Sequence, residues 1–291
     1  MSKDVENKFI AAQLREAASL LEQQGANRFR VNAYRRAADT IESLPHSAAM
    51  VLRTEGLQGL TALPGIGPLI GAAIAEMVRT GQWSQLERLR GALDPEALFS
   101  KVPGIGPKLA HRIIDELHID TLEALETAAH DGRLTNIPGF GLRRLAMVRS
   151  ALAEMLGRGP RRARGDRDEP PVNVLLDVDR EYREKTEAGT LRRIAPKRFN
   201  PRQVAWLPVL HTERDSWQLT ALYSNTALAH ELGRTRDWVV IYFHTDSYTE
   251  DQRTVVTETQ GRLKGRRVVR GRESECDQYY NPVLFNPPNV A

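Results

Sequence analysis

The sequence predicts an all-α N-terminal half with helix-hairpin-helix motifs, a flexible linker, and a small α+β domain with a mainly antiparallel sheet. Three shifts in composition predict this order. The first half is dense in Ala, Leu, Glu and Arg, the stretch "GRGPRRARGDRDEPP" is charged and rich in Gly and Pro, and the second half gathers β-branched and aromatic residues. We expect a helical domain with one hairpin motif over 1–92, a tandem helix-hairpin-helix domain over 93–157, the linker over 158–171 and the α+β domain over 172–291.

The first two helices follow from apolar spacing and from stop signals. Between Ile10 and Leu21, apolar residues recur at i, i+4, i+7 and i+11, and Gly25 lies just beyond as a stop. A second helix, "RVNAYRRAADTIESL", runs up to Pro45. The first half is therefore predicted to be helical throughout.

Three short repeats interrupt these helices: "LPGIGP" at 63–68, "VPGIGP" at 102–107 and "IPGFG" at 137–141. Each is flanked by helical stretches. The proline ends the preceding helix, the apolar residue pins the loop, and the paired glycines supply φ > 0 and leave the backbone bare. The residues in these three roles are Pro64, Pro103 and Pro138; Ile66, Ile105 and Phe140; and Gly65, Gly67, Gly104, Gly106, Gly139 and Gly141.

Such a loop places a row of N–H groups at a helix N-terminus, which is an anion site suited to phosphate. It follows the DNA backbone without touching base edges, so it binds without reading sequence. One Pro-Gly-x-Gly is equally explained as a tight turn, but three copies spaced 35 to 39 residues apart favour a repeated motif. No predicted strand precedes any copy, which excludes a dinucleotide-binding fold.

The stretch "NKFIAAQLREAASLLEQQGANRFRVNAYRRAADTIESLPHS", together with "GLTALPGIG", resembles the N-terminal domain of family X DNA polymerases. The second and third hairpins resemble the following subdomain of bacterial members. The resemblance covers about residues 5–157. It implies a helical region that binds gapped, nicked or damaged DNA, with a monovalent cation held by hairpin carbonyls. It also implies DNA repair in the cytoplasm, on the nucleoid.

One departure from the family concerns abasic-site lyase activity. Members with that activity carry a Schiff-base lysine on the helix after the first hairpin, and here Ala73 stands at that place, with Leu69 one turn before it. Imine chemistry needs an amine, so we expect no lyase activity. The nearest equivalents of the family's phosphate-binding groups are Arg30, Tyr34 and Arg35. They either grip a DNA end or serve as a core tyrosine and two solvated arginines.

Basic residues follow the second and third hairpins. Lys108, His111 and Arg112 fall on one helical face after the second, and Arg143 and Arg144 follow the third. One charged face of a surface helix is usually only solvated. Directly after a phosphate-binding loop, we expect phosphate contact.

The second half lacks the residues of the polymerase reaction. Family X polymerization needs a Gly-Ser motif and three carboxylates that hold two magnesium ions. Asp177 and Asp179 would share a face on a strand, but the near-helical spacing of Leu175, Val178 and Tyr182 favours a helix, where they diverge. No Gly-Ser motif precedes them, and the chain has no His-x-His of the kind found in the exonuclease domain of bacterial members. We expect neither active site.

Five stretches rich in Val, Thr, Trp and Tyr predict the strands of the second domain: "VAWLPVLHTE", "SWQLTALYSN", "DWVVIYFHTD", "RTVVTETQ" and "RRVVRGRES". "TALAHELGR" is predicted to be a helix between the second and third strands. "QGRLKG" suits a hairpin turn.

Few residues of this domain suggest catalysis. The possible metal ligands are His211, His230, Asp237, Glu258, Glu273 and Glu275. No ligand spacing singles them out, so surface or capping roles are the simpler explanation. Cys276 has no base beside it and is predicted to be an unreactive thiol. The basic stretch "GRLKGRRVVRGR" (261–272) either faces phosphate or an acidic partner, or is a solvated hairpin.

Charge and composition limit the function classes. Residues 1–157 hold 18 basic and 18 acidic side chains, so any DNA binding must come from local geometry. No run approaches eighteen apolar residues and no secretion signal is apparent, so we expect no membrane or secreted role. A single cysteine excludes an internal disulfide and a Cys-rich zinc site, and it suits a reducing cytoplasm.

Two functions from different classes remain. The preferred hypothesis is a non-catalytic, sequence-independent DNA-binding protein of DNA repair or processing, whose second domain binds DNA or a repair partner. The alternative is a nuclease-like DNA-processing enzyme with its carboxylates in the second domain. A divalent cation near Glu258 or Asp237 would favour the alternative.

Overall fold

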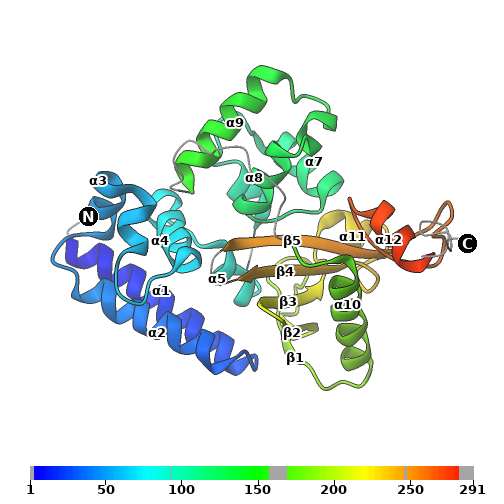
Figure 1. Cartoon of the computed structure of the whole chain (residues 1–291), viewed down its shortest axis with the longest axis horizontal. Helices are drawn as coiled ribbons and strands as arrows, with labels where there is room; N and C mark the ends of the chain where they lie inside the picture. The colour runs from blue at the N-terminus through cyan, green and yellow to red at the C-terminus, as the bar shows by residue number, and fades with distance from the viewer. Residues whose placement is uncertain (1–2, 93, 157–168, 246–247, 282–291) are drawn as a thin grey trace, which may run out of the picture.

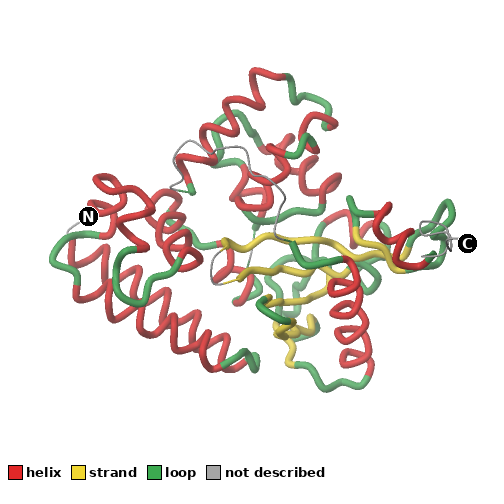
Figure 2. The backbone as a smooth tube through the Cα atoms, in the orientation of Figure 1, coloured by secondary structure: helices red, strands yellow, loops and turns green. Residues whose placement is uncertain are grey.

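Helices form the first part of the chain and an antiparallel sheet the second, which confirms the predicted fold class (Figures 1 and 2). The structure is a computed structural model that describes residues 3–92, 94–156, 169–245 and 248–281. Most of the predicted linker, 157–168, lies outside the described residues. The remaining boundaries between domains stay predictions.

The first helical part holds helices α1 to α5. Their bounds are Lys3–Gln23, Arg28–Ser43, Ala48–Thr61, Pro68–Thr80 and Ser84–Leu89. Gly25, at φ 79°, breaks the chain after α1 as predicted, and the side chain of Asn27 caps α2 by accepting from the N–H of Phe29. The apolar faces of these helices, including Leu14, Tyr34 and Ile74, share one core.

The second helical part has its own core and carries two of the three hairpins. Helices α6 (Pro95–Phe99), α7 (Pro107–Leu117) and α8 (Leu122–His130), the short 3₁₀ helix η1 (Arg133–Asn136) and α9 (Leu142–Met155) form it. Phe99, Ile113, Leu125 and Val148 are buried together at its centre. Within the residues described, no helix combines the length and apolar character that crossing a membrane requires.

The second half begins with helix α10 (Val172–Glu187) and continues as a six-stranded antiparallel sheet in chain order. The strands are β1 Arg192–Ile194, β2 Leu207–Arg214, β3 Trp217–Tyr223, β4 Val239–Thr245, β5 Tyr248–Thr257 and β6 Arg267–Val269. Helix α11 (Ala227–Glu231) lies where the sequence predicts it. The turn between β5 and β6 is also as predicted, closed by the N–H of Gly265 on the carbonyl of Glu258.

Two elements of the second half differ from the sequence prediction. Strand β1 was not expected, because its three residues are largely exposed and two are arginines. The strand predicted over 266–274 ends at Val269, since Gly271 at φ 82° turns the chain into helix α12 (Glu273–Tyr280). The β-propensity of the stretch predicted a longer strand because propensity alone does not show that this glycine turns the chain.

Helix α10 covers one face of the sheet (Figure 1). Tyr182 fixes it there: its hydroxyl donates to the carbonyl of Pro208 at 3.0 Å and accepts from the N–H of Tyr223 at 2.9 Å. The helical assignment also confirms that Asp177 and Asp179 diverge. Asp177 pairs with Arg214 at 2.8 Å and Asp179 with Arg267 at 2.6 Å.

The opposite face of the sheet is polar and packs on the helical parts. Arg88 of α5 forms a buried ion pair with Glu250 of β5, and its guanidinium lies 3.5 Å from the ring centroid of Tyr242. The Tyr242 hydroxyl donates in turn to Asp120, between α7 and α8. Burial raises the pKa of Asp120, and the positive charge of Arg88 opposes that rise without cancelling it. One buried network thus joins both helical parts to the sheet.

Further contacts extend this junction at both ends. Thr127 of α8 donates to Asp251 at 2.9 Å, and Gln252 donates to the backbone carbonyl of His118 at 2.9 Å. On the other side, the Nε2 atom of His211 lies 3.0 Å from the side-chain oxygen of Gln24. The junction is therefore built from hydrogen bonds as much as from apolar contact.

Because the Arg88 and Glu250 side chains are only 5% and 8% exposed, we expect Arg88→Ala to leave an uncompensated buried carboxylate. The free energy of unfolding should fall by about 3–5 kcal/mol. Arg15→Ala is the matched control, since Arg15 pairs with Asp39 on an exposed surface, and it should cost less than about 1 kcal/mol. Equal losses in urea denaturation would show that the junction does not depend on this pair.

Candidate nucleic-acid interface

The three hairpins share one backbone geometry. Their first glycines, Gly65, Gly104 and Gly139, have φ of 74°, 89° and 102°, as the sequence predicts. The second glycines differ from the prediction: Gly67, Gly106 and Gly141 have φ of −83°, −89° and −82° and cap the following helices in an extended conformation. The second glycine is therefore not needed for a positive φ, and what it provides is a helix N-terminus without a side chain.

The apolar residue between the glycines pins each loop as predicted. Ile66, Ile105 and Phe140 are 3%, 3% and 7% exposed. Their N–H groups donate to the carbonyls of Leu63, Val102 and Ile137, which closes each turn. Two of the helices that follow begin with proline, which has no N–H, and the N–H of Leu109 donates to Gly106. The remaining N–H groups of each first turn have no partner within their own helix, so they are available to an anion.

The second and third hairpins line one groove of about 600 Å³. Its lining residues are Gly104, Gly106, Pro107, Lys108, Leu109, Arg112, Pro138, Gly139 and Arg144. The two hairpins are held together across the groove, since Arg112 of α7 donates to the carbonyl of Pro138 at 2.6 Å and the side chain of Met147 on α9 lies against Gly104. The fold thus brings the second and third hairpin loops side by side.

The basic residues predicted around this groove have two different roles. Lys108 and Arg143 are exposed and have no hydrogen-bond or ion-pair partner among the described residues. Arg112 and Arg144 hold loop carbonyls, those of Pro138 and Gly139, while still lining the groove. The first pair is available to phosphate, and the second pair shapes the loop.

His111 is less available than the sequence suggests. Its ring nitrogens lie 3.0 Å from Glu96 and 2.9 Å from Asp115. The hydrogen bond with Glu96 and the charge of Asp115 raise the pKa of His111. Both neighbours are carboxylates, which repel a phosphate, so we assign His111 to the packing of α6 on α7.

The residues predicted around the first hairpin separate in the structure. Tyr34 is buried and donates to Gln85 at 2.8 Å, and Arg35 pairs with Glu22 at 2.6 Å. Arg30 lines a groove of about 490 Å³ beside Gly65 and Gly67, together with Phe29, Arg36 and residues of the sheet, His244 among them.

Sequence reasoning missed Arg36 and Phe29. It named Arg30 and Arg35 of α2 as phosphate-binding candidates and not Arg36, yet Arg36 lines the groove beside the first hairpin and Arg35 does not. Phe29 is 83% exposed in the first turn of α2, one residue before the predicted start of that helix at Arg30. Ala73 is 4% exposed within α4.

The possible metal ligands of the second half do not come together. No group of three or more His, Cys, Asp or Glu side chains in the described part of the chain is arranged to hold a metal ion. Asp237 accepts from Thr257 and Arg267, Glu258 pairs with Arg270, and Glu275 pairs with Arg272. Cys276 is buried, its sulfur accepts from the N–H of Val269, and burial raises its thiol pKa. These groups hold the C-terminal domain together.

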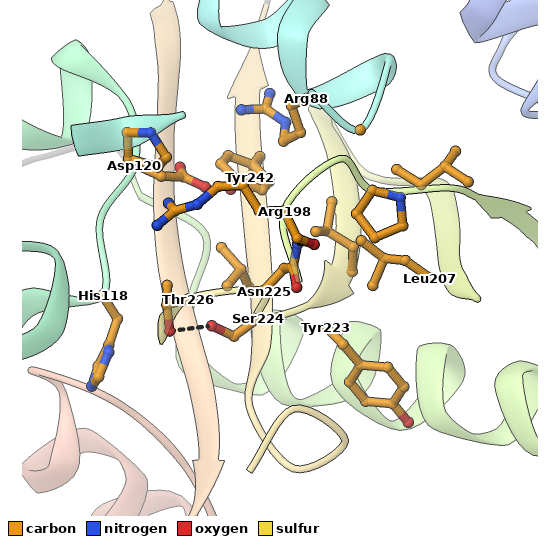
Figure 3. Close-up of a pocket in the computed structure, with 16 residues that line it drawn as sticks. Arg88, His118, Asp120, Arg198, Leu207, Tyr223, Ser224, Asn225, Thr226 and Tyr242 are labelled. Atoms are coloured by element: carbon orange, nitrogen blue, oxygen red, sulfur yellow. Dashed lines mark hydrogen bonds between the residues drawn. The ribbon is translucent and has the colours of Figure 1, made fainter. Parts of the chain in front are cut away.

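A small cavity of about 60 Å³ lies at the junction between the second helical part and the sheet (Figure 3). In Figure 3, Arg88 lies beside Tyr242 and Asp120, Arg198 reaches across the centre, and the ring of His118 points away from the other labelled side chains. This volume has room for about two water molecules. It is too small for a nucleotide, and its polar groups belong to the junction.

Comparison with known proteins supports the N-terminal part. A helix-hairpin-helix domain model matches residues 5–83, and a SAM-like helix-hairpin-helix tandem model matches residues 57–118 and 101–154. The chain is 29% identical over 198 residues to a DNA polymerase/3'-5' exonuclease PolX of Bacillus subtilis, which covers 64% of this chain and 32% of that protein. It is 31% identical over 113 residues to DNA polymerase lambda of Arabidopsis thaliana, which covers 38% and 20%.

The chain thus spans about a third of the first relative and a fifth of the second. The resemblance of its N-terminal part to family X DNA polymerases is confirmed. The helix-hairpin-helix domains and this similarity support DNA binding in repair or processing.

Replacing the two cap glycines tests the groove directly. Nothing lies within 4 Å of a Cβ built at Gly106 or Gly141, and their extended backbone suits a β-branched residue. Gly106→Val and Gly141→Val should therefore leave the helical circular dichroism and the melting temperature unchanged. DNA affinity should fall about tenfold or more, because the branched side chain covers the N–H groups. Unchanged binding by folded variants would exclude the loops as phosphate sites.

Proposed function

We propose that this protein is a sequence-independent DNA-binding protein of DNA repair or processing, without polymerase or abasic lyase activity. The observation that carries the proposal is the groove in which two hairpin loops face each other beside the unpaired side chain of Lys108. Loops that offer backbone N–H groups hold phosphates and ignore bases. Nicked or gapped duplexes are the proposed substrates, since the family resemblance implies them.

A monovalent cation remains part of the proposal only for the first two hairpins. In the third hairpin, guanidinium groups of Arg112 and Arg144 already occupy the carbonyls of Pro138 and Gly139. A guanidinium there supplies the positive charge that a bound cation would supply. No observation on the described residues supports the alternative of a nuclease-like enzyme with its active site in the second domain. Its candidate carboxylates Asp237, Glu258 and Glu275 are paired with arginines.

Salt dependence tests the mode of binding. If roughly four to six phosphates are neutralised, log K should fall with log salt at a slope of about −4 to −5. Lys108→Ala and Arg143→Ala should each make that slope less steep by about one, and the loss of affinity should be equal for DNA of unrelated sequence. Fluorescence anisotropy with two duplexes of different sequence, each intact and with a one-nucleotide gap, provides the measurement. A flat salt response, or strong preference for one sequence, would contradict backbone binding.

Activity assays test the absence of catalysis. With a primed gap, nucleotides and magnesium, the protein should not extend the primer. Borohydride should trap no adduct on abasic DNA, because Ala73 offers no amine. A family member that has both a complete polymerase domain and the Schiff-base lysine is the positive control in both assays. Template-directed extension, or an adduct that maps to residues 1–100, would overturn this part of the proposal.

A further inference from the structure

A pocket lined by arginines lies between the second helical part and the sheet, and nothing above assigns it a role. Its volume is about 240 Å³. The lining residues are Glu116, Leu117, His118, Ile119, Arg133, Gln252, Arg253, Thr254, Arg270 and Gly271. We call it the arginine pocket. It lies at the C-terminal end of α7, whereas the second hairpin lies at the other end of that helix.

The three guanidinium groups of the arginine pocket are each fixed by a carboxylate that does not line it. Arg133 pairs with Asp131 at 2.7 Å, Arg253 with Glu169 at 2.7 Å, and Arg270 with Glu258 at 2.8 Å. A guanidinium has five N–H donors, so one such pair leaves others available. The carboxylates hold the arginines in place and reduce, without removing, the positive charge that they present. Glu116 is the one carboxylate in the lining itself.

Three of the residues that line the arginine pocket each have a buried polar atom without a hydrogen-bond partner among the described residues. These atoms are Nη2 of Arg133, Nδ1 of His118 and Oε1 of Gln252. A buried polar atom without a partner costs free energy, so a bound molecule that satisfies it is stabilised. Burial, together with the charge of Arg270, lowers the pKa of His118 to about 4. The imidazole is therefore neutral at pH 7.

We propose that the arginine pocket binds a phosphate group. Phosphate oxygens accept from the guanidinium groups, and planar arginine forks match their geometry. A neighbouring water, or the hydroxyl of a protonated phosphate, donates to Gln252. The phosphate comes either from DNA that the hairpins hold or from free phosphate in solution. The first source rests on the proposed function.

The position of Arg133 favours the DNA source. Arg133 begins η1, and the third hairpin follows η1 directly at residue 137. The single 3₁₀ helix η1 thus connects the pocket to the third hairpin, and the C-terminal domain adds Arg253 of β5 and Arg270, which follows β6, to the lining. The C-terminal domain then contacts DNA, and the basic stretch 261–272 supplies one of the residues that do so.

The DNA arm of the test uses Arg270→Gln and Arg133→Gln, with Arg262→Gln as the matched control. Arg262 belongs to the same basic stretch, loses the same charge, and is 62% exposed outside the pocket. Each pocket variant should make the salt slope less steep by about one, since one phosphate contact contributes about 0.9 to its magnitude. The DNA affinity at 0.1 M salt should fall about eightfold. The control should change neither. Equal effects of all three would show bulk charge and overturn the DNA source.

The free-phosphate arm uses the full chain without DNA. Inorganic phosphate at constant ionic strength should shift the imidazole resonances of His118 saturably in NMR spectra, while those of His230 stay unchanged. Arg270→Gln should abolish this shift. Saturable binding without any DNA effect assigns the pocket to free phosphate. A pocket that responds in neither arm is not a phosphate site.

The two arms separate this proposal from the proposed function. If Gly106→Val weakens DNA binding and the pocket variants change nothing in either arm, the hairpins bind DNA and the pocket proposal is wrong. If the unaltered protein binds no DNA at all, the proposed function is wrong, and the free-phosphate arm alone decides whether the pocket is a phosphate site.

Discussion

The buried ion pair between Arg88 and Glu250 is the contact on which the arrangement of the molecule depends. It joins the first helical part to the centre of the sheet, and the neighbouring Tyr242 carries the connection on to Asp120 in the second helical part. A charge buried this deeply is tolerated only when its partner is present, so the pair favours a single orientation of the parts. That orientation sets where the hairpins face relative to the sheet.

The hairpins were predictable from sequence because their cause is local. Proline, glycine and one apolar residue determine a tight loop within six positions, and the buried Ile105 confirms that reasoning. The φ of Gly106 was predicted wrongly because the sequence does not show which glycine of the pair turns the chain and which caps the helix. Strand β1 was not predicted because its three residues show no strand pattern of their own and are a strand only through pairing with β2.

The groups that carry charge at the junction were not predictable as a set. Glu250, Asp120 and Arg88 lie in three segments far apart in sequence, and only the register of β5 against the helices brings them together. Arg36 was missed because the sequence pointed to Arg30 and Arg35 of the same helix, and only the packing of α2 shows that Arg36 lies against the first hairpin. The sequence favoured surface or capping roles for the carboxylates of the second domain, but it did not show their arginine partners, which come from other elements.

Both edge strands of the sheet are short. Strands β1 and β6 have three residues each, against seven to ten in the four strands between them. An edge this short presents few unpaired backbone groups to another chain, so copies of the sheet have little template for joining edge to edge. If many copies bind one DNA molecule, as the proposed function allows, short edges lower the chance that neighbouring copies join through their sheets.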